Sequence, residues 1–230
     1  MAIILKESEV ANIGGTTTSD PNRLYTKSRA EALWCAVTAP SGAANNQLIT
    51  GVKNLYNGHA FVDMGFPSGT KWATMNVGAT VPEGYGNYYK WGLGSSTFNT
   101  SQTPYSLASG DLPDSVDTAR QVWGGQWHMP TQNQIKELYL NTTKTYTTLN
   151  GVYVVKFTSK NNSNYIYVPF AGHYWSNGTF HNSTYLALFW SKTSDSSSNA
   201  HCIQSTRLNS TTSTWSEDKN YGLSVRGVVG

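Results

Sequence analysis

Histidine is the side chain of this sequence best suited to acid–base chemistry or zinc binding, and its five copies stand singly. His59 lies far from the others, and His128 precedes a proline and a predicted helix, which indicates a packed or capping side chain. His173, His181 and His201 share a polar C-terminal region, but their spacing matches neither HxH nor HExxH. The sequence therefore predicts no metal site and no cofactor.

No nucleophile has neighbours that would activate it. The segment GFPSG, residues 65–69, is not the GxSxG turn of serine hydrolases, and no glycine-rich phosphate loop precedes a predicted helix. Cys35 and Cys202 lie far apart, outside any CxxC pair, so we interpret them as free, buried thiols. We therefore predict no catalytic residues.

The composition indicates that a framework of strands and loops must position any site. Charged residues make up 13% of the 230 residues and aromatic residues another 13%, while glycine is abundant. The net charge of +3 is small and the basic residues are scattered, which argues against nucleic acid as a partner. The sequence has no run of about 18 apolar residues and no apolar signal-peptide run, so we expect no membrane span and a protein made in the cytoplasm.

Two regions follow each other along the chain. Residues 1–56, with the helix-compatible run NQLITGVKNLY, predict an attachment or oligomerisation segment of short helices or irregular turns, too small to bury a core alone. From Gly58 onward, short apolar runs alternate with Gly, Pro, Asn and Ser, which predicts strands. Strands are expected within HAFVDMGFPSGTKWATMNVGA around the turn FPSGT, at 153–158 and 165–170 as a hairpin, and in TYLALFW, AHCIQSTRL and YGLSVRGVV.

One helix has a clear start. Thr131 is a good N-cap and Gln134 completes a capping box, with Ile135, Leu138 and Tyr139 on one apolar face. Residues 92–116 form a long loop of the kind that is usually functional or disordered. We interpret residues 57–230 as an α+β domain dominated by antiparallel sheet. Its framework tryptophans are predicted to be Trp72, Trp91, Trp123 and Trp127.

Five ordered motifs carry a resemblance to a known family. They are FVDMGFPSGTKWATMNVGATVPEGYGNYYKWG, WGGQWHMPTQNQIKEL, VPFAGHYW, LFWSKT and YGLSVRGV, and they span about residues 58–230. In this order they resemble the FISUMP (major paralogous) domain family of gut Bacteroidetes and their phages, which implies a C-type lectin-like fold. Met75 and Gly227 stand where the family often has Cys and usually has Pro, and both departures are packing changes.

A subset of such domains resembles the variable proteins of diversity-generating retroelements, among them phage receptor-binding proteins. In those systems, erratic copying at template adenines turns AAY codons into NNY codons. These codons encode Ser, Thr, Asn, Tyr and His among others, but never Lys, Glu, Gln, Met or Trp. From His173 to Tyr221, 29 of 49 residues are Ser, Thr, Asn, Tyr or His. The resemblance therefore implies a variable region at about residues 173–221.

The same resemblance divides this region into fixed and changeable positions. The positions implied to be fixed scaffold are Trp175, Trp190, Lys192, Gln204, Trp215, Glu217 and Lys219. The candidates for variation and ligand contact are Tyr174, Asn177, Thr179, His181, Asn182, Tyr185, Phe189, Asp195, Asn199, His201, Ser205 and Asn209.

The residue types of the region favour binding independently of the family. Tyr offers a large contact area with few rotatable bonds, and Ser, Asn and Gly offer adaptable hydrogen bonds, as in antibody paratopes. In TYLALFW, strand alternation predicts that Tyr185, Ala187 and Phe189 point outward and that the residues between them point inward. The alternative is a solvated polar surface without a partner, which exposed Tyr, Phe and His argue against.

Three functional hypotheses follow. The first is a phage receptor-binding protein on the virion tail that binds a bacterial surface protein or glycan, with residues 1–56 attaching it to the tail or driving homo-oligomerisation and avidity. The second is a non-variable, lectin-like protein of the bacterial cell surface. The third is an enzyme related in fold to formylglycine-generating oxidases, which use a pair of cysteines where Cys202 stands alone. Calcium-dependent sugar binding is not predicted, because Glu-Pro-Asn and Trp-Asn-Asp signatures are absent.

Overall fold

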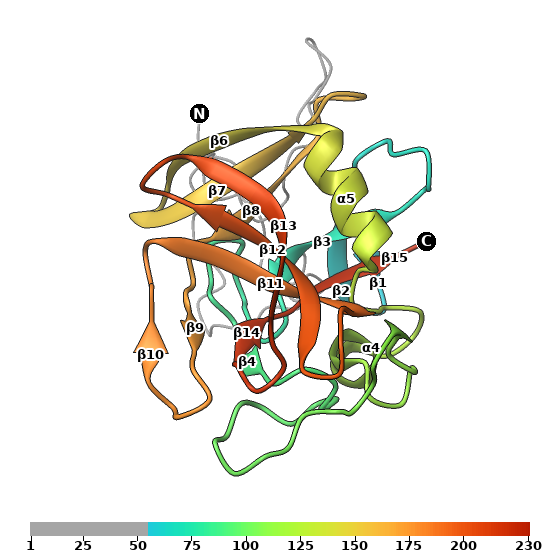
Figure 1. Cartoon of the computed structure of the whole chain (residues 1–230). Helices are drawn as coiled ribbons and strands as arrows, with labels where there is room; N and C mark the ends of the chain where they lie inside the picture. Colours follow the sequence, from blue (N-terminus) through green and yellow to red (C-terminus); the bar gives the residue numbers. More distant parts are fainter. Residues whose placement is uncertain (1–54) are drawn as a thin grey trace, which may run out of the picture.

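The computed structural model describes residues 55–230, which form a largely antiparallel β structure with two helices (Figure 1). The predictions made for residues 1–54, including the free thiol at Cys35, lie outside the described residues. Leu55 and Tyr56, placed by sequence in the N-terminal helix-compatible run, instead form strand β1 (Leu55–Tyr56) and pair with β2 (His59–Asp63). The boundary after residue 56 therefore cuts a β-hairpin.

The first sheet joins the two ends of the described chain. Its order is β1, β2, β3 (Lys71–Asn76) and β15 (Arg226–Val229), with every pair antiparallel. Arg226 is fully buried, and its guanidinium donates hydrogen bonds to the side chain of Asn76 and to the backbone oxygens of Ala73 and Tyr167. A buried cation has to be satisfied in this way, so these bonds lock the last strand to β3 and to a neighbouring sheet.

The second sheet carries most of the predicted variable region. Its order is β13 (Thr211–Asp218), β12 (Asn199–Thr206), β11 (Leu186–Ser194), β14 (Leu223–Ser224) and β4 (Tyr88–Tyr89), and β5 (Gly110–Asp111) also pairs with β11. The pairing of β11 with β14 is parallel and the others are antiparallel. The strand predictions for TYLALFW and AHCIQSTRL are confirmed as β11 and β12, whereas YGLSVRGVV forms two short strands, β14 and β15, in different sheets. The polar strand β13 was not predicted.

A third sheet and a small hairpin complete the strands. The sheet has the order β6 (Thr142–Leu149), β7 (Val152–Ser159) and β8 (Tyr165–Pro169), and the hairpin consists of β9 (His173–Tyr174) and β10 (Phe180–His181). The predicted hairpin corresponds to β7 and β8 and is confirmed. In Figure 1 the third sheet lies at the top and the β9–β10 hairpin at the lower left.

The predicted helix is α5 (Gln132–Leu140). The Thr131 hydroxyl accepts a hydrogen bond from the Gln134 backbone N–H, and the Gln134 side chain accepts one from the Thr131 N–H. Ile135 and Leu138 are buried and Tyr139 is half-buried. Both the capping box and the apolar face are therefore confirmed.

A short helix that the sequence did not predict, α4 (Thr118–Trp123), begins at a buried carboxylate. Asp117 accepts hydrogen bonds from the backbone N–H groups of Arg120 and Met129, and its Oδ2 lies 3.6 Å from Lys192 Nζ. Burial raises the pKa of Asp117, and these donors and the Lys192 charge oppose that shift. The carboxylate thus ties the helix start to the chain before α5.

Strand β11 is covered on both faces. Ala187 and Phe189 belong to a core cluster that includes α5 and the first sheet, while Leu188 and Trp190 belong to a second cluster rich in tryptophan. The prediction that Ala187 and Phe189 point to solvent is therefore wrong, because each face of β11 packs against one of these two clusters. The framework tryptophans are confirmed as buried: Trp72, Trp91, Trp123 and Trp127.

Residues 92–116, drawn in green at the bottom of Figure 1, contain only the short strand β5 and otherwise form the long loop that was predicted. Two buried lysines hold this loop by its backbone carbonyls. Lys90 Nζ donates to the oxygens of Thr100 and Gln102, and Lys219 Nζ donates to the oxygen of Leu107. Among residues 55–230, no helix has the length and apolar character needed to cross a membrane.

Candidate ligand-binding surface

Four of the predicted contact residues lie within the β9–β10 hairpin and a fifth, Asn182, directly follows it. The base of the hairpin is tightly closed. Gly172 has a positive φ of +66°, and a Cβ there would lie 2.4 Å from the backbone oxygen of His181. Tyr174 exchanges two backbone hydrogen bonds with Gly222, which connects the hairpin to the chain just before β14. The hairpin is therefore attached to the second sheet through Tyr174, and its base closes at Gly172, where only glycine fits.

An aromatic cluster supports the hairpin from below. The Tyr174 ring stacks on Phe98 at 4.9 Å between ring centres and meets Phe180 at 4.8 Å and Tyr88 at 5.1 Å. The Tyr88 hydroxyl donates to the backbone oxygen of Ala171, and burial raises the pKa of Tyr88. Tyr174 is only partly exposed, so it serves more as support than as free contact area.

The tip of the hairpin is exposed. The chain turns at Asn177 and Gly178, where the Asn177 side chain accepts a hydrogen bond from the Thr179 N–H. Trp175 is 41% exposed, yet its ring stacks on His181 at 3.6 Å between centres. A large apolar ring is thus held in one orientation at the surface, as a preorganised contact requires.

His173 lies beneath this tip and is buried. Its ring centre is 5.7 Å from Tyr221 and 6.4 Å from His181. Burial, and next the charge of His181, lowers the pKa of His173 to about 4. The folded hairpin therefore contains a neutral His173 near pH 7.

Tyr185 and Asn209 extend the surface beyond the hairpin. Tyr185 precedes β11 and is 43% exposed, and Asn209 is exposed in the turn between β12 and β13. The backbone N–H of Arg207 donates to the Tyr185 oxygen, so this turn adjoins Tyr185. We use "hairpin surface" for the exposed residues of this region, which are Trp175, Asn177, Thr179, Phe180, Asn182 and Tyr185.

Three predicted residues lie elsewhere. Asp195 and Asn199 flank the turn between β11 and β12, at the opposite end of these strands from Tyr185. His201 Nε2 lies 3.5 Å from Asp195 Oδ1, and its Nδ1 lies 3.3 Å from the side-chain nitrogen of Gln132 at the start of α5. The structure does not bring this group onto the hairpin surface.

Two residues that were predicted to contact a ligand are buried instead. Phe189 is fully buried, with its ring centre 5.9 Å from that of Trp72. Ser205 is 1% exposed, and its hydroxyl forms a hydrogen bond with that of Thr212. Both side chains face the core cluster under α5, so neither can meet a ligand in this fold. The remaining ten candidates are exposed or half-buried.

The positions implied to be fixed scaffold differ in their exposure. Trp190 and Lys219 are buried and Lys192, Gln204 and Glu217 are half-buried. Trp175 and Trp215 are exposed, because Trp175 lies on a projecting hairpin and Trp215 on the outer face of edge strand β13. Sequence reasoning missed Trp175 and Phe180 as contact residues, although the Asn-Gly turn between them indicated a hairpin.

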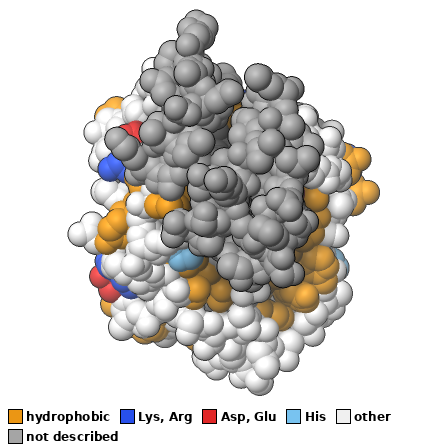
Figure 2. Space-filling view, turned by 180° about the vertical axis from the view of Figure 1, so that it is seen from behind, with side chains coloured by type: hydrophobic (Ala, Val, Ile, Leu, Met, Phe, Trp, Pro, Cys, Tyr) orange, Lys and Arg blue, Asp and Glu red, His pale blue; other side chains and the backbone are white. Residues whose placement is uncertain are grey.

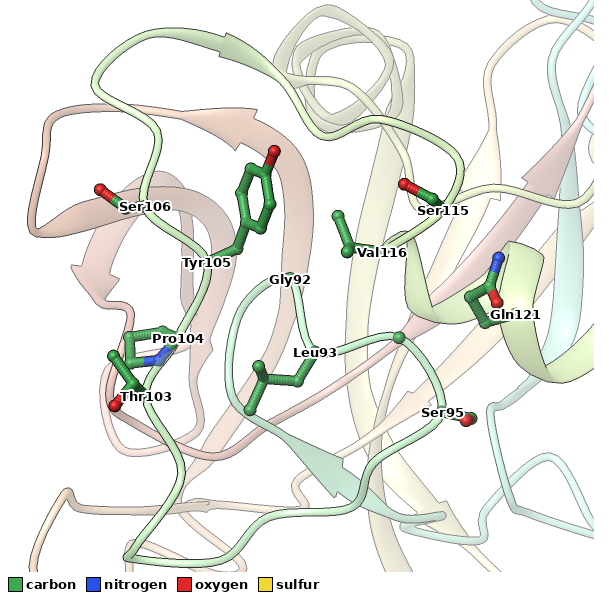
Figure 3. Close-up of a pocket in the computed structure, with 11 residues that line it drawn as sticks. Gly92, Leu93, Ser95, Thr103, Pro104, Tyr105, Ser106, Ser115, Val116 and Gln121 are labelled. Carbon is green, nitrogen blue, oxygen red and sulfur yellow. The ribbon is translucent and has the colours of Figure 1, made fainter.

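A separate open pocket of about 460 Å³ lies in the long loop (Figure 3). Leu93, Pro104 and Tyr105 supply apolar walls, and Ser115 and Gln121 lie across from them. None of its lining residues carries a charge or is a histidine, so the pocket contains no acid–base pair for catalysis.

Charge is sparse on the part of the described surface that Figure 2 shows. Figure 2 shows isolated blue and red groups among many polar and hydrophobic side chains. Within residues 55–230 there is no cluster of three or more His, Cys, Asp or Glu side chains that could hold a metal ion. Cys202 is free and buried as predicted, and burial raises the pKa of its thiol.

Comparisons of the chain with models of protein families, with curated proteins and with solved structures find no match. The function of the chain is therefore inferred from the geometry of residues 55–230.

Proposed function

We propose that this chain is a ligand-binding display protein that uses the hairpin surface to bind a bacterial surface protein or glycan, as a phage receptor-binding protein does. The observation that carries the proposal is that aromatic rings are exposed on and beside a hairpin whose base is tightly closed. Trp175, Phe180 and Tyr185 are each 40% or more exposed, while the residues beneath them pack into aromatic clusters. Exposed rings on rigid supports are the usual anchors of binding interfaces.

The proposal includes a C-type lectin-like fold and diversification of residues 173–221 by a retroelement. Antiparallel sheets, two helices and the long loop 92–116 in the described residues are compatible with that fold. The exposed hairpin is rich in side chains that NNY codons encode, and the buried Trp190 and Lys219 are not among them. Diversification at the exposed hairpin positions would then change the contact surface, whereas changes at the buried Phe189 or Ser205 would disturb the internal packing.

An enzymatic function of the formylglycine-generating type has no support in the described residues. Such chemistry needs an accessible, easily ionised thiol. Cys202 is fully buried and its pKa is raised, so its thiolate is disfavoured.

The test removes the three exposed rings together. The variant Trp175→Ala, Phe180→Ala, Tyr185→Ala in the full chain is expected to keep its fold and to bind host cells at least about thirtyfold more weakly, because such rings act as hot spots. The matched control is Val122→Ala with Leu140→Ala, which removes exposed apolar side chains on α4 and α5. Equal binding by both variants, measured by cell adsorption, would refute the hairpin surface as the contact.

The gene neighbourhood separates the phage proposal from a non-variable cell-surface protein. A retroelement predicts a nearby reverse transcriptase gene and a near-copy of the 3′ end whose mismatches fall at adenines. Mismatches without adenine bias, or no such copy, would refute diversification and leave the binding surface to be tested by itself.

A further inference from the structure

Arg207, in the turn after β12, lies between two tyrosine rings. Its guanidinium carbon is 4.1 Å from the ring centre of Tyr153 and 5.1 Å from that of Tyr185. Tyr153 belongs to β7 of the third sheet and Tyr185 precedes β11 of the second, so the two sheets build this clamp together. Nε of Arg207 donates a hydrogen bond of 2.6 Å to the backbone oxygen of Thr184, which fixes the guanidinium in place.

The two terminal nitrogens of Arg207 have no acceptor among residues 55–230, and no carboxylate in that range forms an ion pair with it. A guanidinium presents its terminal N–H groups as a planar fork that matches the two oxygens of a carboxylate. The neighbouring rings and the Nε bond already restrict this fork. Binding a carboxylate would therefore cost little further side-chain entropy.

Leu208 adds an apolar neighbour to this cation. It is 76% exposed, more than any other large hydrophobic side chain of the described residues. A glycan offers mostly hydroxyl groups and little apolar area to cover a leucine, whereas a protein surface offers apolar side chains beside acidic ones. The combination of exposed Tyr and Leu side chains with a half-buried Arg therefore favours a protein ligand.

We propose that Tyr153, Arg207 and Tyr185 form a carboxylate-binding subsite that takes an Asp or Glu side chain of a partner protein, with an apolar residue of that partner on Leu208. This inference deepens the proposed function, on which it rests, by giving the chemistry of the partner. Tyr185 belongs both to the hairpin surface and to the subsite, so the two surfaces are continuous.

The test uses the full chain and a displayed library of random peptides. Peptides selected on the wild-type protein are expected to share an acidic residue next to an apolar one. Their affinity is expected to fall at least about thirtyfold for Arg207→Gln, because the fork is lost, and markedly for Arg207→Lys, which keeps the charge without the fork. The control Lys136→Gln removes one exposed positive charge on α5 and should leave affinity unchanged.

The outcomes separate the subsite from the hairpin surface. Selected peptides without acidic residues, or equal affinity for wild type and Arg207→Gln, would overturn the subsite. A uronic acid oligosaccharide that binds in an Arg207-dependent way, while no acidic peptide does, would overturn the choice of a protein ligand. Thermal unfolding of Arg207→Lys verifies that any loss of peptide affinity is not caused by a loss of fold. Host-cell adsorption by Arg207→Gln at the wild-type level would refute the subsite and leave the proposed function standing.

Discussion

Replacing Lys219 by Met tests whether a buried cation holds the long loop in place. Lys219 is 1% exposed, and its ammonium donates hydrogen bonds to the backbone oxygens of Leu107 and Ser196 and to the Ser194 hydroxyl. It also lies 4.4 Å from the ring centre of Trp91. Methionine has a similar length and no charge, so the change removes the donors and keeps most of the volume.

The expected decrease in the free energy of unfolding follows from the carbonyl oxygens that Lys219 leaves without a donor. The Ser194 hydroxyl has one proton and lies 2.6 Å from the Leu107 oxygen and 2.9 Å from the Ser196 oxygen, so it can satisfy one of them. The other carbonyl, which is partly buried, is left without its lysine donor, which costs about 1–3 kcal/mol, and the lost cation–π contact with Trp91 adds about 1–2 kcal/mol. Burial lowers the pKa of Lys219 and Asp195 opposes this, so a neutral side chain recovers part of the cost. We expect a net loss of about 2–4 kcal/mol.

Thermal unfolding of the full chain measures this loss. For a protein of this size, 1 kcal/mol corresponds to about 2–4 °C, so Tm should fall by about 5–15 °C. Limited proteolysis should show faster cleavage within residues 92–116, because Leu107 is no longer held. The control Lys136→Met changes an exposed lysine and should alter stability by less than about 0.5 kcal/mol. A Lys219→Met protein as stable as the wild type, or one with an equally resistant loop, would refute the reasoning.

Three further predictions concern the core, the pH dependence and the hairpin base. Phe189→Ala removes a fully buried ring and should lower the free energy of unfolding by about 3–5 kcal/mol. Tyr185→Ala removes a ring that is 43% exposed and should lower it by about 1 kcal/mol or less. Chemical denaturation compares the two variants, and equal losses would contradict the assignment of core and surface. Burial lowers the pKa of His173 from 6.5 to about 4, so the unfolded chain binds a proton at this residue more readily than the folded protein does. Protonation of His173 therefore leaves the free energy of unfolding unchanged above pH 6.5 and lowers it by about 3 kcal/mol as the pH falls toward 4. Between pH 6.5 and 4, the wild type should lose this much more stability than His173→Phe, as measured by thermal unfolding. Identical pH profiles of the two proteins would rule out the lowered pKa of His173. Gly172→Ala should destabilise the protein more than Gly151→Ala, because both have a positive φ but only the first places a Cβ against backbone; similar Tm values for the two would show that the hairpin base can move.

The sequence predicted elements that carry their own local signals. The α5 helix has both a capping box and an apolar face, and the strands β7, β8 and β11 are rich in apolar residues, so propensity and burial agree there. Strands β6 and β13, TTKTYTTL and TTSTWSED, lack a continuous apolar face because each lies at the edge of its sheet. Their pairing with β7 and β12 orders them, and sequence patterns do not reveal such a partner.

The candidate site was predictable in composition and only partly in geometry. Ten of the twelve predicted contact residues are exposed or half-buried, and the hairpin gathers Tyr174, Asn177 and Thr179. Phe189 was misplaced because alternation assumes one free face of a strand, whereas the cluster under α5 covers one face of β11 and the tryptophan-rich cluster covers the other. Asp195 and His201 share the composition of the hairpin but lie at the other end of their strands. Separation along a strand cannot be read from residue types.

The exposed tryptophans change what diversification would mean for this protein. NNY codons cannot encode Trp, so under the proposed mechanism Trp175 and Trp215 stay constant although both are exposed. The Trp175 ring rests on His181, a position that NNY codons can change, so a substitution there would re-orient a constant ring. Every variant would then keep a large aromatic contact, and the residues around it would set its direction and its polar neighbours. Affinity would have a fixed aromatic source, and specificity would come from the side chains that support and surround it.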